Sequence, residues 1–260
     1  MKKTSIWRKL HHIWITTGAT VGIVFVVWSL LAYRATAVAH QALQSDAAVT
    51  VTTGDGSWSF TPRTPSAAGL IFFPGGLVDP VAYAPLAHAV AAAGYPSVLV
   101  QVPMRGAFGG ANSPAVLSRA HLAARSHGHV RAWILAGHSR GGVIASQIGR
   151  DGFPSLAGLV LIGTSHPRDF SLASLAIPVT RIYATHDTIA SVEKLERTRG
   201  NLPASTRMVR IDGGNHSQFG YYGFQPADWP ATISRDAQQA ITRQAIIDIL
   251  ASAVPRIPAS

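Results

Sequence analysis

The stretch AWILAGHSRGGVIA, residues 132–145, decides the fold. Its first five residues form an apolar run typical of a buried strand, and a helix is expected from residue 140 onward. Between them lies GHSRG, residues 137–141, a G-x-S-x-G motif. On a sharp strand-to-helix turn, side chains two residues from the serine would collide, and glycines avoid that collision. The segment therefore predicts a turn that exposes Ser139 as a nucleophile, whereas the alternative is a helix N-cap serine between glycines.

The rest of the chain alternates short apolar strands with helical segments. We expect a hairpin of residues 49–52 and 58–61, then strands at residues 69–73, 97–102, 130–136, 156–162, 179–184 and 207–211. Helices are expected at residues 80–93, 114–127, 140–150, 189–199 and 231–253. Continuous apolar strands of this kind indicate a mostly parallel sheet covered on both faces. The predicted fold class is α/β, a three-layer α/β/α sandwich whose site lies at the carboxyl ends of the strands.

A histidine and an acid follow later strands, in the chain order serine, acid, histidine. His216 comes after the last strand and is predicted to be the general base. Asp187, just past the strand at residues 179–184, is predicted to orient the imidazole and to stabilise its charged form. Asp212 and Asp169 are the rival acids. Asp212 is close to His216 along the chain and cannot easily face it from a separate loop, whereas Asp169 follows an earlier strand.

Backbone amides for a developing oxyanion are predicted at two turns. The glycine-rich loop FPGGL, residues 73–77, follows an early strand, and the N–H of Leu77, or less favourably that of Gly76, is the first candidate. The N–H of Arg140, at the start of a helix, is the second. The alternative for residues 73–77 is an ordinary turn.

Four residues are predicted to bind substrate: Gly76, Arg105, His138 and Phe219. Basic loop residues such as Arg105 favour an anionic or carbonyl-rich substrate, and solvated loop charge is the equal alternative. Phe219 is expected to form a wall of the pocket, with core packing as its alternative.

Composition excludes several other classes of site. The 260-residue chain is 47% hydrophobic, and its net charge is +10. Five of its 22 Lys and Arg residues precede residue 35 and all 12 acidic residues follow it, which leaves 17 against 12, a net charge of +5, on the remainder. Without a cluster of basic residues and interleaved aromatics, we expect no nucleic-acid partner. The chain has no cysteine and its histidines lack ligand spacing, so no metal or organic cofactor is expected.

The N-terminus is predicted to be a membrane anchor. Residues 13–33 form a run of 21 residues without a formal charge, long enough as a helix to cross the roughly 30 Å hydrocarbon core. Basic residues before the run predict a cytoplasmic tail at residues 1–12, a linker at residues 34–48 and an extracytoplasmic domain at residues 49–255. A signal peptide cleaved near Ala37-Val38-Ala39, with secretion of the domain, is the main alternative. A buried helix of the soluble domain is the other.

Three motifs together resemble the α/β-hydrolase family that includes dienelactone-hydrolase-like members. They are PGG at residues 74–76, GHSRGG at residues 137–142 and GGNHSQFGYYG at residues 213–223, and the resemblance covers roughly residues 68–250. It implies a Ser139, Asp187 and His216 triad with oxyanion amides at Leu77 and Arg140. Dienelactone hydrolases proper use a cysteine nucleophile, whereas this chain has a serine, so the resemblance does not carry over their substrate.

The predicted activity is hydrolysis of a carboxylic ester of a small acyl substrate through an acyl-enzyme. Only 16 residues, 163–178, separate two of the expected strands, which predicts a minimal cap and an open site. The alternatives are an acyltransferase or amidase acting on a cell-envelope substrate, and a non-catalytic envelope binding protein on a hydrolase scaffold.

Overall fold

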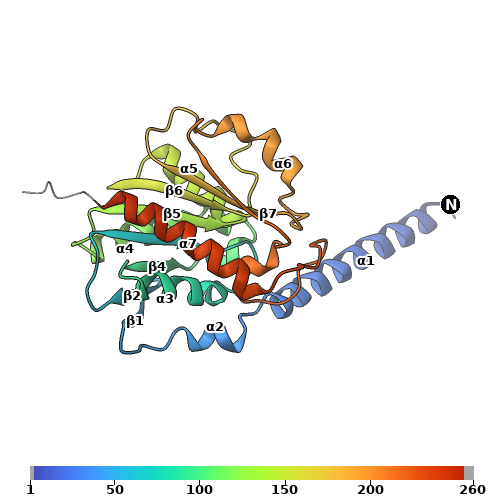
Figure 1. Ribbon diagram of the computed structural model, residues 1–260. Helices are drawn as coiled ribbons and strands as arrows, with labels where there is room; N and C mark the ends of the chain where they lie inside the picture. Colours follow the sequence, from blue (N-terminus) through green and yellow to red (C-terminus); the bar gives the residue numbers. More distant parts are fainter. Residues whose placement is uncertain (1–2, 255–260) are drawn as a thin grey trace, which may run out of the picture.

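The sheet at the centre of the molecule is mixed and is covered by helices on both faces (Figure 1). The computed structural model describes residues 3–254, and within that range the sheet has eight strands in the order β1-β2-β4-β3-β5-β6-β7-β8. Strands β1 and β2 form the expected hairpin, β2 pairs antiparallel with β4, and the other neighbours are parallel. The strands are β1 Val49–Gly54, β2 Ser57–Pro62, β3 Ala68–Phe73, β4 Ser97–Val100, β5 Ala132–His138, β6 Leu156–Ile162, β7 Val179–Ala184 and β8 Arg207–Ile211.

Two hydrophobic clusters lie on opposite faces of this sheet. Alternate residues of β3 enter different clusters: Leu70 packs under α3 and α7, whereas Ile71 packs under α4 and α5. The strands are buried on both faces, which explains their continuous apolar sequences. The helices are α1 Lys3–Ala32, α2 Ala37–Gln41, α3 Ala84–Ala92, α4 Pro114–Ser126, α5 Arg140–Asp151, α6 Val192–Arg197 and α7 Arg235–Ala253. The short 3-10 turns are η1 Pro80–Tyr83, η2 Pro103–Gly106, η3 Gly110–Asn112, η4 Arg199–Asn201 and η5 Ser217–Phe219.

The predicted three-layer α/β/α fold is confirmed, with three differences in its helices. The helix expected at residues 189–199 is the shorter α6, which begins after its N-cap Ser191. The helix expected at residues 80–93 is divided into η1 and α3, because Tyr83 leaves helical geometry with φ −103° and ψ 0°. The helix expected from residue 231 begins later, where the Ser234 hydroxyl caps it by accepting the N–H of Ala237 at 3.1 Å. The segment at residues 163–178 contains neither helix nor strand, as a minimal cap requires.

Helix α1 projects away from the sheet, and its far end is the N-terminus (Figure 1). Residues Ser5–Trp28 are long and apolar enough to cross a membrane, and they are not buried by the rest of the chain. This candidate span starts earlier than the expected residues 13–33. Tyr33 is instead buried in the domain, with its ring 5.8 Å from that of Tyr222. Residues 1–2 of the expected tail and residue 255 of the expected domain lie outside the described range.

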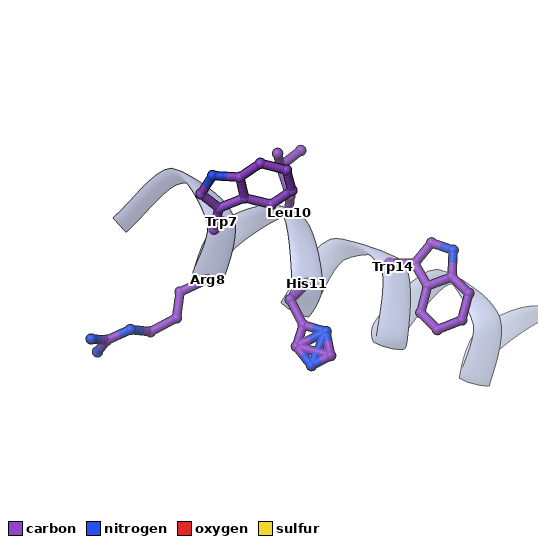
Figure 2. A pocket seen from close by; sticks show the side chains of 5 residues that line it. All are labelled: Trp7, Arg8, Leu10, His11 and Trp14. Atoms are coloured by element: carbon purple, nitrogen blue, oxygen red, sulfur yellow. The ribbon is translucent and has the colours of Figure 1, made fainter. Parts of the chain in front are cut away.

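Figure 2 shows a shallow hollow on the first turns of α1, between side chains that diverge from the helix. It has a volume of about 820 Å³ and is lined by Trp7, Arg8, Leu10, His11 and Trp14. All of these residues precede the domain and come from one helix, so this hollow is separate from the candidate catalytic residues. Tryptophan and basic side chains at one end of an apolar helix are typical of a membrane interface.

Candidate active site

Ser139 lies on a strained turn between β5 and α5. Its φ of 52° and ψ of −114° fall outside the regions that non-glycine residues normally adopt. A Cβ at Gly137 would collide with the backbone of Gly141, and a Cβ at Gly141 would collide with the carbonyl of Phe73. The two glycines of the motif therefore allow β3, β5 and α5 to pack closely around the turn that carries Ser139, whose role as nucleophile stays a prediction.

His216 and Asp187 form a buried pair on neighbouring loops. The Nδ1 of His216 lies 2.8 Å from Oδ2 of Asp187, and both side chains are buried. The other carboxylate oxygen accepts the N–H groups of Ile189 at 2.9 Å and Ala190 at 2.7 Å. These bonds fix the carboxylate, and the carboxylate in turn favours a proton on Nδ1, which leaves Nε2 as the basic nitrogen.

The two rival acids do not occupy this position. Asp212 pairs with Arg210 at 2.6 Å on the surface, as its closeness in sequence to His216 suggested. Asp169, in the segment after β6, makes no hydrogen bond with His216 within residues 3–254. Asp187 is therefore the acid that the structure brings to the histidine.

The imidazole of His216 lies beside the strained turn. Its ring centroid is 4.4 Å from that of His138, the residue that directly precedes Ser139. The Ser139 hydroxyl makes no hydrogen bond to the described residues 3–254, and its bond with His216 therefore stays a prediction. Such bonds commonly tighten only when substrate enters the site.

The two turns predicted to supply oxyanion amides lie next to each other. A Cβ at Gly76 would lie 3.3 Å from the Cβ of Arg140, which occupies the first position of α5. Helical N–H groups at that position lack an intrahelical partner and point out of the helix. Leu77 has a φ of 64°, and its N–H donates to the carbonyl of Arg105 at 2.6 Å. The Leu77 amide can bind an oxyanion only if it exchanges this partner.

His138 and Phe219, predicted to bind substrate, are placed behind the imidazole of His216. Both are 1% exposed, and their ring centroids lie 5.3 Å apart. The Nδ1 of His138 is 2.8 Å from the hydroxyl of Tyr83. Burial, with a smaller contribution from His216, holds the pKa of His138 well below its usual 6.5. His138 is thus a neutral packing partner of His216, and Phe219 packs against the ring of His138.

The pocket that contains Ser139 is small, polar and positively charged. It has a volume of about 170 Å³, and its lining includes Arg140, His166, Arg168 and Ile189. Behind it the buried guanidinium of Arg181 donates to the carbonyl of His166 at 2.7 Å. Burial lowers the pKa of Arg181 to about 10. Arg181 therefore remains charged at neutral pH and adds to the positive potential of the pocket.

The predicted substrate residue Arg105 lies outside this pocket. It pairs with Asp79 at 3.3 Å and lines an apolar groove on the other side of Leu77. Gly76 precedes Leu77, which lines the groove, and it neighbours Arg140, which lines the small pocket. The structure thus brings Gly76 and Arg140 close to Ser139 and places Arg105 farther along the same edge.

Two buried side chains that hold the loop carrying His216, here called the histidine loop, were not predicted from the sequence. Asp228 accepts the N–H of His216 at 3.1 Å and the N–H of Ser217 at 2.8 Å. Gln238, on α7, accepts the N–H of Asn215 at 3.0 Å and donates to its carbonyl at 2.7 Å. A polar glutamine on the core face of an amphipathic helix is the sequence signal that marks Gln238. Asp228 lies in a loop and has no comparable signal.

Metal ligands do not gather in the described part of the chain. Within residues 3–254 no group of three or more histidine, aspartate or glutamate side chains has the geometry to hold a metal ion.

A strained serine at the end of a central strand, next to a histidine held by an acid, defines the α/β-hydrolase class of fold and site. The comparison of sequences agrees with this class: the profile of the alpha/beta hydrolase family matches residues 69–240. The chain belongs to that family. None of the curated proteins is significantly similar to it in sequence.

Solved structures share the fold at low sequence identity. A dienelactone hydrolase-like promiscuous phosphotriesterase from metagenomic libraries has a TM-score of 0.60 and 14% identity, covering 80% of this chain and 100% of its own. A hyperthermophilic esterase from the archaeon Pyrobaculum calidifontis has a TM-score of 0.58 and 17% identity, covering 91% and 94%. A thermophilic esterase from Thermogutta terrifontis has a TM-score of 0.53 and 14% identity, covering 82% and 100%. At such identities the likeness concerns the fold.

Proposed function

We propose that the chain is a serine esterase that cleaves a carboxylic ester, or a related acyl bond, through an acyl-enzyme. The observation that carries this proposal is the buried His216–Asp187 pair beside the strained turn of Ser139. Two of the structural relatives, from Pyrobaculum calidifontis and Thermogutta terrifontis, are esterases, which supports the same class of reaction.

The reaction begins when the Ser139 hydroxyl attacks the ester carbonyl. His216 takes the hydroxyl proton on Nε2, and Asp187 stabilises the imidazolium that forms. The proton then passes to the leaving alcohol as the ester C–O bond breaks. In the second half, His216 takes a proton from water as the hydroxide attacks the acyl carbonyl. The bond between the acyl carbon and Oγ of Ser139 then breaks, His216 returns the proton to Oγ, and the acid leaves.

The tetrahedral oxygen is stabilised by backbone N–H groups. The N–H of Arg140 is one donor, because it begins α5 directly after the nucleophile. The second donor comes from residues 76–77. The Leu77 amide has its hydrogen bond with Arg105 in the free enzyme, so the oxyanion replaces that carbonyl as acceptor. Removal of one such donor typically costs about 10²–10³ in kcat.

We further propose that α1 anchors the enzyme to a membrane with the tail inside and the domain outside the cytoplasm. The apolar span Ser5–Trp28, with Lys2 and Lys3 before it and the basic residues 8 and 9 in its first turns, supports this orientation. Intact-mass measurement of the protein from membranes tests the anchor directly. A mass that includes residues 1–34 supports it, and a mass that begins near residue 40 means a cleaved signal peptide.

Ester hydrolysis is tested with the full chain in detergent and nitrophenyl acetate as substrate. The parent protein is expected to release nitrophenol with a burst, and Ser139→Ala is expected to lower kcat by about 10⁴-fold or more. Asp187→Asn leaves the nucleophile in place and is the matched variant, with an expected loss of about 10⁴-fold. Equal activity of the parent and Ser139→Ala would contradict the proposal.

An acyltransferase and an amidase would form the same acyl-enzyme. Added alcohols distinguish an acyltransferase from the esterase in the same assay. Added alcohols that increase nitrophenol release and appear as new esters indicate an acyltransferase. A folded parent protein that neither bursts nor hydrolyses acetate indicates a binding protein on this scaffold.

A further inference from the structure

An apolar groove lies between the last turns of α1 and the loop that follows β4. It has a volume of about 470 Å³, in the range of small-molecule sites. Phe25 and Val26 line it from α1, Met104 and Phe108 line it from the loop, and Leu77 lies where it approaches the oxyanion turn. The groove is thus formed jointly by the candidate membrane span and the catalytic edge.

Hydrogen bonds hold the end of α1 against the loops of the catalytic edge. The N–H of Asp79 donates to the carbonyl of Tyr33 at 2.9 Å, directly after the oxyanion turn. The N–H of Gly223 donates to the carbonyl of Ala32 at 3.1 Å, in the loop that follows His216. The catalytic edge therefore begins where the candidate span Ser5–Trp28 ends. A helix that crosses a bilayer would hold this edge at the membrane surface.

Large apolar side chains are exposed on the loops around this edge. Phe108 is 84% exposed and Met104 is 68% exposed, although both belong to residue types that are usually buried. Phe224 and Trp229, in the loop between β8 and α7, are 61% and 62% exposed. Such side chains are costly in water, and they are typical of a surface that rests in the lipid headgroup region.

We infer that the groove binds the alkyl chain of an ester substrate that resides in the membrane. This inference rests on the proposed esterase activity and names its substrate class. The chain enters from the bilayer between Val26 and Phe108, and Leu77 leads it to the turn where Gly76 neighbours Arg140. The ester carbonyl then reaches Ser139, and the polar remainder of the molecule occupies the small charged pocket beyond it. The bond that breaks is the ester C–O bond described above.

Chain-length preference tests the groove in the full chain, reconstituted in phosphatidylcholine vesicles. The ratio of kcat/KM for nitrophenyl octanoate to that for nitrophenyl acetate is measured for the parent, Phe108→Ser and Val26→Ser. Each buried methylene contributes about fourfold, equivalent to about 0.8 kcal/mol, so the parent is expected to favour octanoate. Each groove variant is expected to lower the ratio by about tenfold. Leu117→Ser, an exposed aliphatic position on α4 outside the groove, is the matched control with an unchanged ratio.

A parent without octanoate preference, or groove variants with the parent ratio, would overturn the inference. Failure of the esterase proposal is recognised separately, because then the parent does not hydrolyse acetate either. In that case the groove is tested by binding alone, with a hexadecyl ether that carries a diazirine at mid-chain. Photo-crosslinks to the peptide containing residues 104–108, reduced in Phe108→Ser, support the groove. Crosslinks confined to the outer turns of α1 contradict it.

Discussion

Replacement of Asp228 by asparagine tests how the histidine loop is held. The Asp228 carboxylate is 4% exposed and accepts three hydrogen bonds, from the N–H of His216 at 3.1 Å, the N–H of Ser217 at 2.8 Å and the Ser217 hydroxyl at 2.9 Å. Asparagine keeps one acceptor oxygen and turns an NH₂ group toward the other donors. One buried N–H then has no acceptor, which costs about 1–3 kcal/mol. For a domain of this size the melting temperature is expected to fall by roughly 2–12 °C.

The catalytic effect of Asp228→Asn acts through the position of His216. A shift of about 1 Å in a catalytic group can cost about 10²-fold, so kcat for nitrophenyl acetate is expected to fall by about 10–100-fold with KM little changed. Ser217→Ala is the matched control, because it removes one hydroxyl and leaves both backbone N–H bonds to Asp228 in place. Its kcat is expected to stay within about threefold of the parent. An unchanged kcat in Asp228→Asn would refute this role.

The stability of Asp228→Asn also depends on pH. Burial, the largest influence, raises the pKa of Asp228 above its usual 3.8, so the folded protein holds this proton more tightly than the unfolded chain. Stability contributed by Asp228 is therefore largest at acid pH and falls as the pH rises above 3.8. Urea unfolding at several pH values is expected to show that the difference in free energy of unfolding between parent and variant becomes smaller as the pH rises. A difference that becomes larger would contradict this assignment.

Three further predictions concern the surroundings of the nucleophile. The pKa of buried His138 is depressed, so this residue contributes stability above pH 6.5 that is lost as the pH falls below 6.5. In His138→Gln the free energy of unfolding, measured with urea, is expected to depend less on pH, by up to about 1.4 kcal/mol per pH unit. An unchanged dependence of that free energy on pH would contradict this prediction. Arg168, which donates to the Ser165 hydroxyl in the small pocket, is expected to bind a carboxylate on the alcohol half of the ester, the half that occupies this pocket. Arg168→Gln should lower kcat/KM for carboxyphenyl acetate about tenfold and leave kcat/KM for nitrophenyl acetate unchanged; equal losses for the two esters would exclude this role. Gly141→Ala places a methyl group against the carbonyl of Phe73, so it is expected to destabilise the fold by about 1–3 kcal/mol and to abolish hydrolysis; wild-type kinetics and melting would contradict this.

The layout of the fold and the candidate nucleophile could be predicted because they depend on local patterns. Apolar strand runs specify a sheet buried on both faces, and the strained turn at Ser139 needs glycines at fixed positions. Asp187 could be chosen over Asp212 because Asp212 is so close to His216 along the chain that it cannot easily face the imidazole from a separate loop. Those signals can be recognised in the sequence without three-dimensional information.

Interactions between distant segments could not be predicted in the same way. Asp228 reaches His216 from a loop without regular structure, and no periodic pattern marks such a residue. His138 and Phe219 have the residue types expected of substrate ligands, and only the packing of three elements shows that His138 lies against His216 and Phe219 against His138. The docking of α1 depends on backbone hydrogen bonds, such as that between Asp79 and Tyr33, which do not depend on side-chain identity.

Covalent capture of the nucleophile would test the whole account most directly. The full-length protein is incubated with a fluorophosphonate and then analysed by intact-mass spectrometry and by peptide mapping. A hydroxyl activated by a neighbouring imidazole predicts one adduct, located on residue 139 and lost when that serine becomes alanine. A folded protein that stays unmodified, or that carries the adduct on a different serine, would contradict it.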